Sequence, residues 1–257
     1  AVSAAVAPLV TKVMAYVIFR LIFTVFSPEF TIFILRVTDA MIWIGTLAIF
    51  FGAVMALSQK DYKRMLSYIV IAEIGYIIGG IGVANTTAVK GAIFHIVNDA
   101  LMVACLFSVA GLVMHKTHGH RIDDFKGIFR NMPITAVVFT VGALAVIGIP
   151  PTCGFFSKWY LLLGGIKAGQ WAFVAALLVS TLINVALFFK IFDRGLYVHG
   201  QHTESHDARP GYAHNYWEAP LGMLLPAVVL ALAIVLVGIF NQAIMNNLIG
   251  YAVPPGF

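Results

Sequence analysis

Long apolar stretches constrain this sequence more than any other feature. A helix of about 20 apolar residues crosses the roughly 30 Å hydrocarbon core of a bilayer, and about seven such stretches account for most of the chain. Because 61% of the residues are apolar and only 11% are charged, a water-soluble domain with a polar surface cannot be built from them. The sequence predicts an all-α, polytopic transmembrane helix bundle that forms a single domain over residues 1–257. The predicted spans are 2–25, 32–57, 66–84, 91–114, 133–164, 170–192 and 219–241.

Basic residues are unevenly distributed among the loops between these spans. The loops after the second, fourth and sixth spans hold nine: Lys60, Lys63, Arg64, Lys116, Arg121, Lys126, Arg130, Arg194 and Arg209. The loops of the other face hold two, Lys90 and Lys167. Since basic loops favour the cytoplasmic side, loops 58–65, 115–132 and 193–218 are predicted to be cytoplasmic, in a cell inner (plasma) membrane. The positive net charge of +5 is then explained by the basic loops that orient the chain in the membrane. No nucleic-acid partner is expected.

The fifth predicted span is too long for a straight crossing and is interrupted in its middle. Gly148, Pro150, Pro151 and Gly154 fall there, and the prolines remove backbone donors while the glycines relax the chain. We therefore expect a broken helix. In transporters, broken helices at membrane depth mark ion or substrate sites. The simpler alternative is a proline kink without a site.

Ionisable residues inside the spans are the second strong signal. Arg20, Arg36 and Lys190 lie near span ends, where long side chains can snorkel to the interface. Lys12 and Lys158 lie deeper, where an insertion penalty of about 3 kcal/mol per charge applies. A cost of this size indicates a role, and a buried lysine can pass a proton to a neighbouring charge or water.

The fourth span adds a histidine and an acid. His95 and Asp99 are four residues apart and therefore share a helix face, and histidine changes charge most easily near neutral pH. Asp39 and Glu73 are possible ion-pair partners for the buried bases. We predict that Lys12, His95, Lys158 and Asp99 carry protons or cations, against the alternative that they are buried structural polar residues.

Other kinds of site are disfavoured by the sequence. Cys105 and Cys153 lie in apolar segments, which suits a role in packing. Two cysteines are also too few for an iron–sulfur cluster. His95 is the sole histidine within a span, so a haem-bearing membrane cytochrome is disfavoured. The loop histidines lack the spacing of a metal site. No phosphate loop or catalytic triad is present either, so we expect no cofactor, no metal and no catalytic centre in this chain.

Two segments resemble a known family. Residues 61–76, DYKRMLSYIVIAEIGY, resemble the Asp-x-Lys-Arg-x-Leu-Ala-Tyr-Ser-Ser…Gly signature of the proton-translocating membrane subunits of respiratory complex I (NADH:quinone oxidoreductase), Mrp-type sodium/proton antiporters and membrane-bound hydrogenases. Residues 148–160, GIPPTCGFFSKWY, are similar to their Gly-x-Pro-Pro-x-x-Gly-Phe-x-Ser-Lys-Trp-Tyr segment, with wording nearest to the Mrp D-type subunit. The likeness extends to about residue 195.

The resemblance implies an architecture and a set of site residues. The family is described as fourteen helices with two inverted five-helix repeats, each with a broken helix and a key lysine, and this chain resembles helices eight to fourteen. Lys12 then matches the lysine of the eighth helix, His95 the histidine of the eleventh, and Lys158 the lysine or glutamate of the broken twelfth. The first half is expected to be removed, supplied by another chain or left outside the structure.

One departure from the family pattern bears on conduction. The eleventh helix often reads His-x-x-x-His-Ala-x-x-Lys, whereas this chain has His95, Asp99 and Val103 at those places. A connecting lysine is lost and an acid is gained. Either the proton path is rerouted through Asp99 and water, or the subunit conducts poorly.

The leading hypothesis is therefore a cofactor-free subunit that moves protons, or sodium and protons, within a multisubunit complex. Its expected partners are other membrane subunits of such an assembly, with a peripheral redox arm as a further candidate. The alternatives are a non-conducting structural subunit and a stand-alone solute transporter, the latter disfavoured because a second inverted repeat is lacking. Whether the whole complex is an oxidoreductase stays open at this point.

Overall fold

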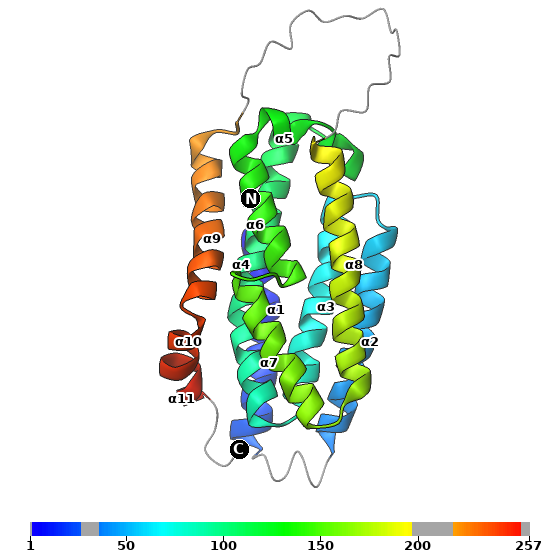
Figure 1. Ribbon diagram of the computed structural model, residues 1–257, viewed down its shortest axis with the longest axis vertical. Helices are drawn as coiled ribbons and strands as arrows, with labels where there is room; N and C mark the ends of the chain where they lie inside the picture. Colours follow the sequence, from blue (N-terminus) through cyan, green and yellow to red (C-terminus); the bar gives the residue numbers. More distant parts are fainter. Residues whose placement is uncertain (1, 27–35, 197–217, 253–257) are drawn as a thin grey trace, which may run out of the picture.

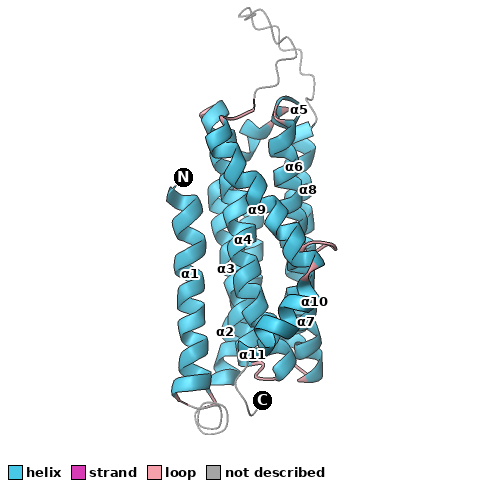
Figure 2. Cartoon of the chain, turned by 90° about the vertical axis from the view of Figure 1, so that its left-hand side faces the viewer, coloured by secondary structure: helices cyan, strands magenta, loops and turns pink. Residues whose placement is uncertain are grey.

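The computed structural model describes residues 2–26, 36–196 and 218–252, and its regular elements are helices (Figure 1). The prediction of an all-α bundle with one broken helix is confirmed. The long helices stand side by side along one common direction (Figures 1 and 2). In chain order the main helices are α1 (Val2–Arg20, continued by a π-helical turn Leu21–Val25), α2 (Val37–Ser58), α3 (Tyr62–Gly82), α4 (Thr86–Thr117), α5 (Ile128–Asn131), α6 (Pro133–Ile147), α7 (Cys153–Lys167), α8 (Trp171–Leu196) and α9 (Leu221–Ile239). The chain then continues through α10 (Asn241–Ile244), a π-helical turn Met245–Ile249 and α11 (Gly250–Ala252).

Several of these helices suit a bilayer. Among the described residues, α2, α3, α4, α8 and α9 are long and apolar enough to cross a membrane, and α6 is a shorter apolar helix. Large apolar side chains cover the outside of the bundle: Trp43, Leu182, Phe189 and Leu225 are each at least 60% exposed. An outward apolar surface of this kind is stable against lipid and not against water.

α4 is the central helix of the bundle. It contacts α1, α3, α6, α7 and α9, and its side chains are buried along most of its length. Asn85 caps its start by accepting a hydrogen bond from the backbone N–H of Ala88 at 2.8 Å. The helix ends at Thr117, and the next residue, His118, takes the left-handed conformation (φ 55°) common after a helix.

The two loops that precede α3 and follow α4 are joined at one end of the bundle. The backbone N–H of Tyr62 donates to the carbonyl of His120 (3.0 Å), and that of Ile122 donates to the carbonyl of Lys60 (2.9 Å). Asp61 caps α3 by accepting a hydrogen bond from a backbone N–H in its first turn. Most of the basic residues predicted for the cytoplasmic face lie in or next to these two loops, so they gather at a single end of the bundle.

A break divides the fifth predicted span into α6 and α7. Gly148 ends α6 with φ +89°, a conformation that residues with a Cβ rarely adopt, and the Pro150–Pro151 peptide bond is cis. Gly154 lies in the first turn of α7, where a Cβ would collide with the carbonyl of Ala145. α9 packs directly on the break, since a Cβ at Gly238 would overlap the Pro151 carbonyl.

Candidate functional site

Two large apolar clusters fill most of the bundle, and a polar layer lies between them. On α3, residues 62–70 contribute to one cluster and residues 76–81 to the other. On α4, residues 102–113 belong to the first of these clusters and residues 88–92 to the second. Glu73 falls in the interval on α3, and His95 and Asp99 fall in the interval on α4. On α7, Lys158 lies between Cys153 of one cluster and Leu161 of the other. With Lys12, these four are the buried lysines, acids and histidine among the described residues. The chain therefore concentrates its buried charge at one depth.

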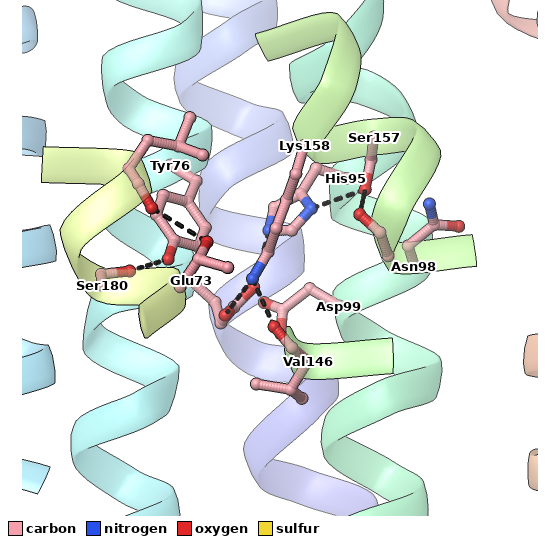
Figure 3. Close-up of polar contacts among 12 residues, drawn as sticks. Glu73, Tyr76, His95, Asn98, Asp99, Val146, Ser157, Lys158 and Ser180 are labelled. Atoms are coloured by element: carbon pink, nitrogen blue, oxygen red, sulfur yellow. Dashed lines mark hydrogen bonds and ion pairs between the residues drawn. The ribbon is translucent and has the colours of Figure 1, made fainter. Parts of the chain in front are cut away.

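Glu73 is the centre of this polar layer (Figure 3). Its Oε1 lies 3.2 Å from Lys158 Nζ, and its Oε2 lies 2.9 Å from His95 Nε2. Glu73 and His95 have no exposed surface, and Lys158 is 5% exposed. α3, α4 and α7 thus each contribute one ionisable side chain to a single contact group, which we call the Glu73 triad.

Lys158 also provides a hydrogen-bond donor at the break between α6 and α7. Its ammonium donates a hydrogen bond to the carbonyl of Val146, in the last turn of α6, where carbonyls lack partners within the helix. A positive charge at a helix C-terminus is also favoured by the helix dipole. The same ammonium lies 4.7 Å from the centre of the Tyr76 ring. The charge on Lys158 is therefore shared between Glu73, the end of α6 and an aromatic face.

His95 has a polar neighbour at each ring nitrogen. Its Nδ1 lies 2.9 Å from Ser157 Oγ, which is 3.2 Å from the carbonyl of Gly154. When the single Ser157 hydrogen is donated to Gly154, Nδ1 must donate, so a further donation from Nε2 to ionised Glu73 requires a doubly protonated ring. When Ser157 donates to Nδ1, neutral His95 can donate from Nε2. Rotation of the hydroxyl and gain of one proton interconvert these two arrangements.

Lys12 and Asp99 form the second ion pair of the layer. Lys12 Nζ lies 2.6 Å from Asp99 Oδ2, and both side chains are almost fully buried. Lys12 also donates to the hydroxyl of its neighbour Thr11 at 3.2 Å. Asp99 interacts electrostatically with Glu73 and His95 as well, so the pair and the triad are electrically connected. With His95 neutral, two lysines and two carboxylates leave the layer without net charge.

Known proteins share both the sequence and the layout of this chain. Residues 1–184 match the family described as "NADH:quinone oxidoreductase/Mrp antiporter, TM". The chain belongs to this family. The prediction from the two sequence motifs is thereby confirmed. NADH-quinone oxidoreductase subunit N of Desulforudis audaxviator is 40% identical over 98% of this chain and 51% of its own length. The D-type subunit of the Na(+)/H(+) antiporter of Alkalihalophilus pseudofirmus is 32% identical over 79% of this chain and 41% of its own length.

Chains of two solved complexes share the fold. A chain of the Mrp complex from Dietzia superposes with a TM-score of 0.83 at 21% identity, over 98% of this chain and 53% of its own. A chain of respiratory complex I from Thermus thermophilus gives 0.78 at 22% identity, over 93% and 48%. The chain thus spans about half the length of the relatives that it matches.

The structure brings most of the predicted site residues together. Lys12, His95, Asp99 and Lys158 share the polar layer, although they divide into a pair and a triad. The two suggested acidic partners differ. Glu73 is the centre of the triad, whereas Asp39 is exposed at the start of α2 and forms no ion pair with the described residues.

Three contacting residues were missed by the sequence reasoning: Ser157, Tyr76 and Ser180. Ser157 and Tyr76 contact the triad directly, and Ser180 on α8 is hydrogen-bonded to the Tyr76 hydroxyl. A signal existed for Tyr76, since it follows Glu73 by three positions and therefore shares its helix face. No comparable signal pointed to Ser180, because only the packing of α8 reveals its partner.

Val103 lies where the resemblance implies a lysine. It is 3% exposed and belongs to the apolar cluster that also contains Met102 and Leu106. A path that continued along α4 from Asp99 would therefore enter an apolar region. The polar contacts instead leave α4 sideways, toward α1 through Asp99 and toward α3 and α7 through His95.

Proposed function

We propose that this chain moves protons, or exchanges sodium for protons, as part of a membrane subunit of a complex I-like, Mrp-antiporter or membrane-bound hydrogenase assembly. The observation that carries the proposal is the buried polar layer, in which Lys12, Asp99, Glu73, His95 and Lys158 contact or interact electrostatically with one another at one depth. Protons are moved by groups that can gain and lose them next to a partner that can do the same.

A purely stabilising role does not account for such a layer. Buried ion pairs cost desolvation that often equals or exceeds their attraction, and apolar residues of similar volume are frequently as stable. The surrounding helices are apolar, so apolar contacts at these positions would also satisfy the fold. The ion-pair contact of His95 Nε2 with Glu73 and the hydrogen bond of Nδ1 with Ser157 further suit a residue that changes protonation state.

The proposed path has two stages. A proton on Lys12 passes to Asp99, which leaves neutral Lys12 and a carboxylic acid, and then moves to the ring of His95. Lys158 first releases its own proton to the far side of the layer and becomes neutral. His95 then gives its Nε2 proton to Glu73, from which it reaches Lys158 and restores an ammonium beside a carboxylate. Each transfer breaks one N–H or O–H bond and forms another, so no redox group is needed in this chain.

The partners and setting belong to the same proposal. Relatives of this chain are named as subunits of NADH-quinone oxidoreductase and of sodium/proton antiporters. We therefore expect other membrane subunits beside this chain, and a peripheral redox arm if the assembly is of the complex I kind. The basic loops favour a cytoplasmic position for the end of the bundle that holds Asp61 and Arg121, in a cell with this protein in its plasma membrane.

A second candidate function is a structural subunit that keeps the fold without conducting. Val103 favours it, because this apolar, buried side chain occupies the place of the connecting lysine. The two candidates differ in a single respect, namely whether protons cross the polar layer. The experiment must therefore measure proton movement and assembly separately.

Proton flux in proteoliposomes that hold the assembled complex tests the proposal. We would drive flux by an imposed membrane potential and compare wild type with Lys158→Ala and with Lys190→Ala, whose lysine is exposed on α8. Lys158→Ala should lower flux at least about 100-fold, the effect of losing a proton-transfer group, while Lys190→Ala should not. Unchanged flux in assembled Lys158→Ala would establish the structural alternative. Repeating the measurement with and without sodium distinguishes the ion.

A further inference from the structure

Three buried polar side chains lie outside the proposed path, on the side of the triad that faces α8. Tyr76 belongs to α3, and Ser180 and Asn184 belong to α8. Tyr76 has no exposed surface, and Ser180 and Asn184 are each 1% exposed. Ser180 and Asn184 are four residues apart and therefore lie on the same face of α8. Their neighbours on that buried face are apolar, so the polar groups are exceptions that call for a reason.

Tyr76 links Ser180 to the triad (Figure 3). Its hydroxyl forms a hydrogen bond with Ser180 Oγ. The Lys158 ammonium lies 4.7 Å from the centre of its ring. A chain of contacts thus runs from Lys158 on α7, through Tyr76 on α3, to α8.

Asn184 lies one helical turn beyond Ser180 and extends this row of polar side chains. Its Nδ2 is buried and has no hydrogen-bond partner among the described residues. A buried amide donor without a partner costs about 1 to 3 kcal/mol, and native structures usually satisfy such groups with a protein group or a bound water. A water held by Asn184 would continue the row of hydroxyls, since buried waters bind where several polar groups converge.

We propose that Tyr76, Ser180 and Asn184 form a hydroxyl arm that carries protons between Lys158 and the α8 side of the bundle. The proposal rests on the proposed function, because it adds a branch to the same polar layer. Lys158 gives a proton to the Tyr76 hydroxyl, whose own hydrogen moves to Ser180 Oγ, and the Ser180 hydrogen passes to a water held by Asn184, whose amide carries no proton itself. Every hydroxyl then ends with one hydrogen, and rotation of the O–H bonds resets the row.

The hydroxyl arm and the Lys12–Asp99 pair leave the triad toward different helices. α1 and α8 lie at opposite sides of the bundle in Figure 2. Beyond Asn184, α8 contributes Phe188, whose ring centre is 6.0 Å from that of Phe139, and Phe139 in turn is 5.0 Å from Phe129. These three rings, which we call the aromatic barrier, separate the arm from the end of the bundle that carries the basic loops.

The test removes single hydroxyls and keeps the remaining shape. In the assembled complex, Tyr76→Phe and Ser180→Ala should each lower proton flux about tenfold, which corresponds to the loss of about one hydrogen bond from the transfer path. Asn184→Leu should do the same, because it removes the polar end of the arm at similar volume. Ser180→Thr restores a hydroxyl and should return flux to within about twofold of wild type.

Matched controls separate this role from packing. Tyr62→Phe removes a buried hydroxyl from the same helix, where it donates to the Leu106 carbonyl, and Ser108→Ala removes a hydroxyl that bonds within α4. Both should keep wild-type flux. If Tyr76→Phe and Ser180→Ala also keep it while Lys158→Ala abolishes flux, the arm is wrong and the proposed function stands. If Lys158→Ala has no effect, the proposed function itself fails.

Discussion

The Glu73 triad and the Lys12–Asp99 pair share one layer, but they are held very differently. The triad joins α3, α4 and α7, and its two bases have further contacts: Lys158 with the end of α6, His95 with Ser157. The pair joins α4 to α1, and apart from Asp99 the polar contact of Lys12 among the described residues is the hydroxyl beside it on its own helix. We infer that the triad is the rigid part of the proton path. The Lys12–Asp99 pair is the part that separates and forms again as protons pass.

The central role of Glu73 in the triad is tested most directly by changing Glu73 itself. Glu73→Gln keeps the shape and removes the charge that Lys158 and His95 share. We expect flux to fall at least about 100-fold and the free energy of unfolding to fall by about 3 to 5 kcal/mol, since a buried ammonium is left unpaired. Flux assays and thermal melting in detergent measure the two effects. A variant with wild-type melting and flux would remove Glu73 from the centre of the site.

A smaller effect is expected at the Lys12–Asp99 pair. Lys12→Met and Asp99→Asn should each lower the free energy of unfolding by about 2 to 3 kcal/mol, the lower part of the range for a buried charge that loses its partner. The double variant should recover about 1 to 3 kcal/mol of their sum, because neither charge is then unpaired. Flux should fall in all three. Strict additivity in a thermal-melting cycle would mean that the ion pair does not hold α1 to α4.

The next effect in size concerns how the triad is positioned. Ser157→Ala removes the hydroxyl that contacts His95 Nδ1 and should lower the free energy of unfolding by about 1 kcal/mol. Flux should fall about fivefold, the rate equivalent of that energy, and its dependence on pH should change because one arrangement of His95 protons is lost. Ser157→Thr keeps a hydroxyl and should restore both. If Ser157→Ala shows the wild-type pH profile, the serine acts in packing alone.

The helices and the break followed from local patterns, whereas the contacts between helices did not. Apolar runs predicted the bundle, and Gly148 and the two prolines predicted the break, because each acts within its own segment. The depth of Lys12 and Lys158 was likewise readable from their positions within spans. What the sequence lacks is helix rotation. Asp39 and Glu73 were equal candidates until packing turned one outward and the other into the centre.

Rotation also explains why the hydroxyl arm was invisible in the sequence. Serines, threonines and asparagines occur throughout the spans, and many of those in the structure bond to a carbonyl one turn earlier on the same helix, as Ser108 and Thr140 do. Ser180 is different because its partner is on another helix, 104 residues away. Residue type and spacing carry no information about such a contact, so only the packed bundle distinguishes it.

The smallest expected effect sharpens the contrast between the two acids. Asp39→Asn changes the same type of group as Glu73→Gln, but at an exposed position on α2 without an ion pair among the described residues. We expect its free energy of unfolding to stay within about 0.5 kcal/mol of wild type and its flux to be unchanged. A large loss of flux would show that Asp39 receives protons or cations at the end of the bundle, and the path would then have to include α2 as well as the polar layer.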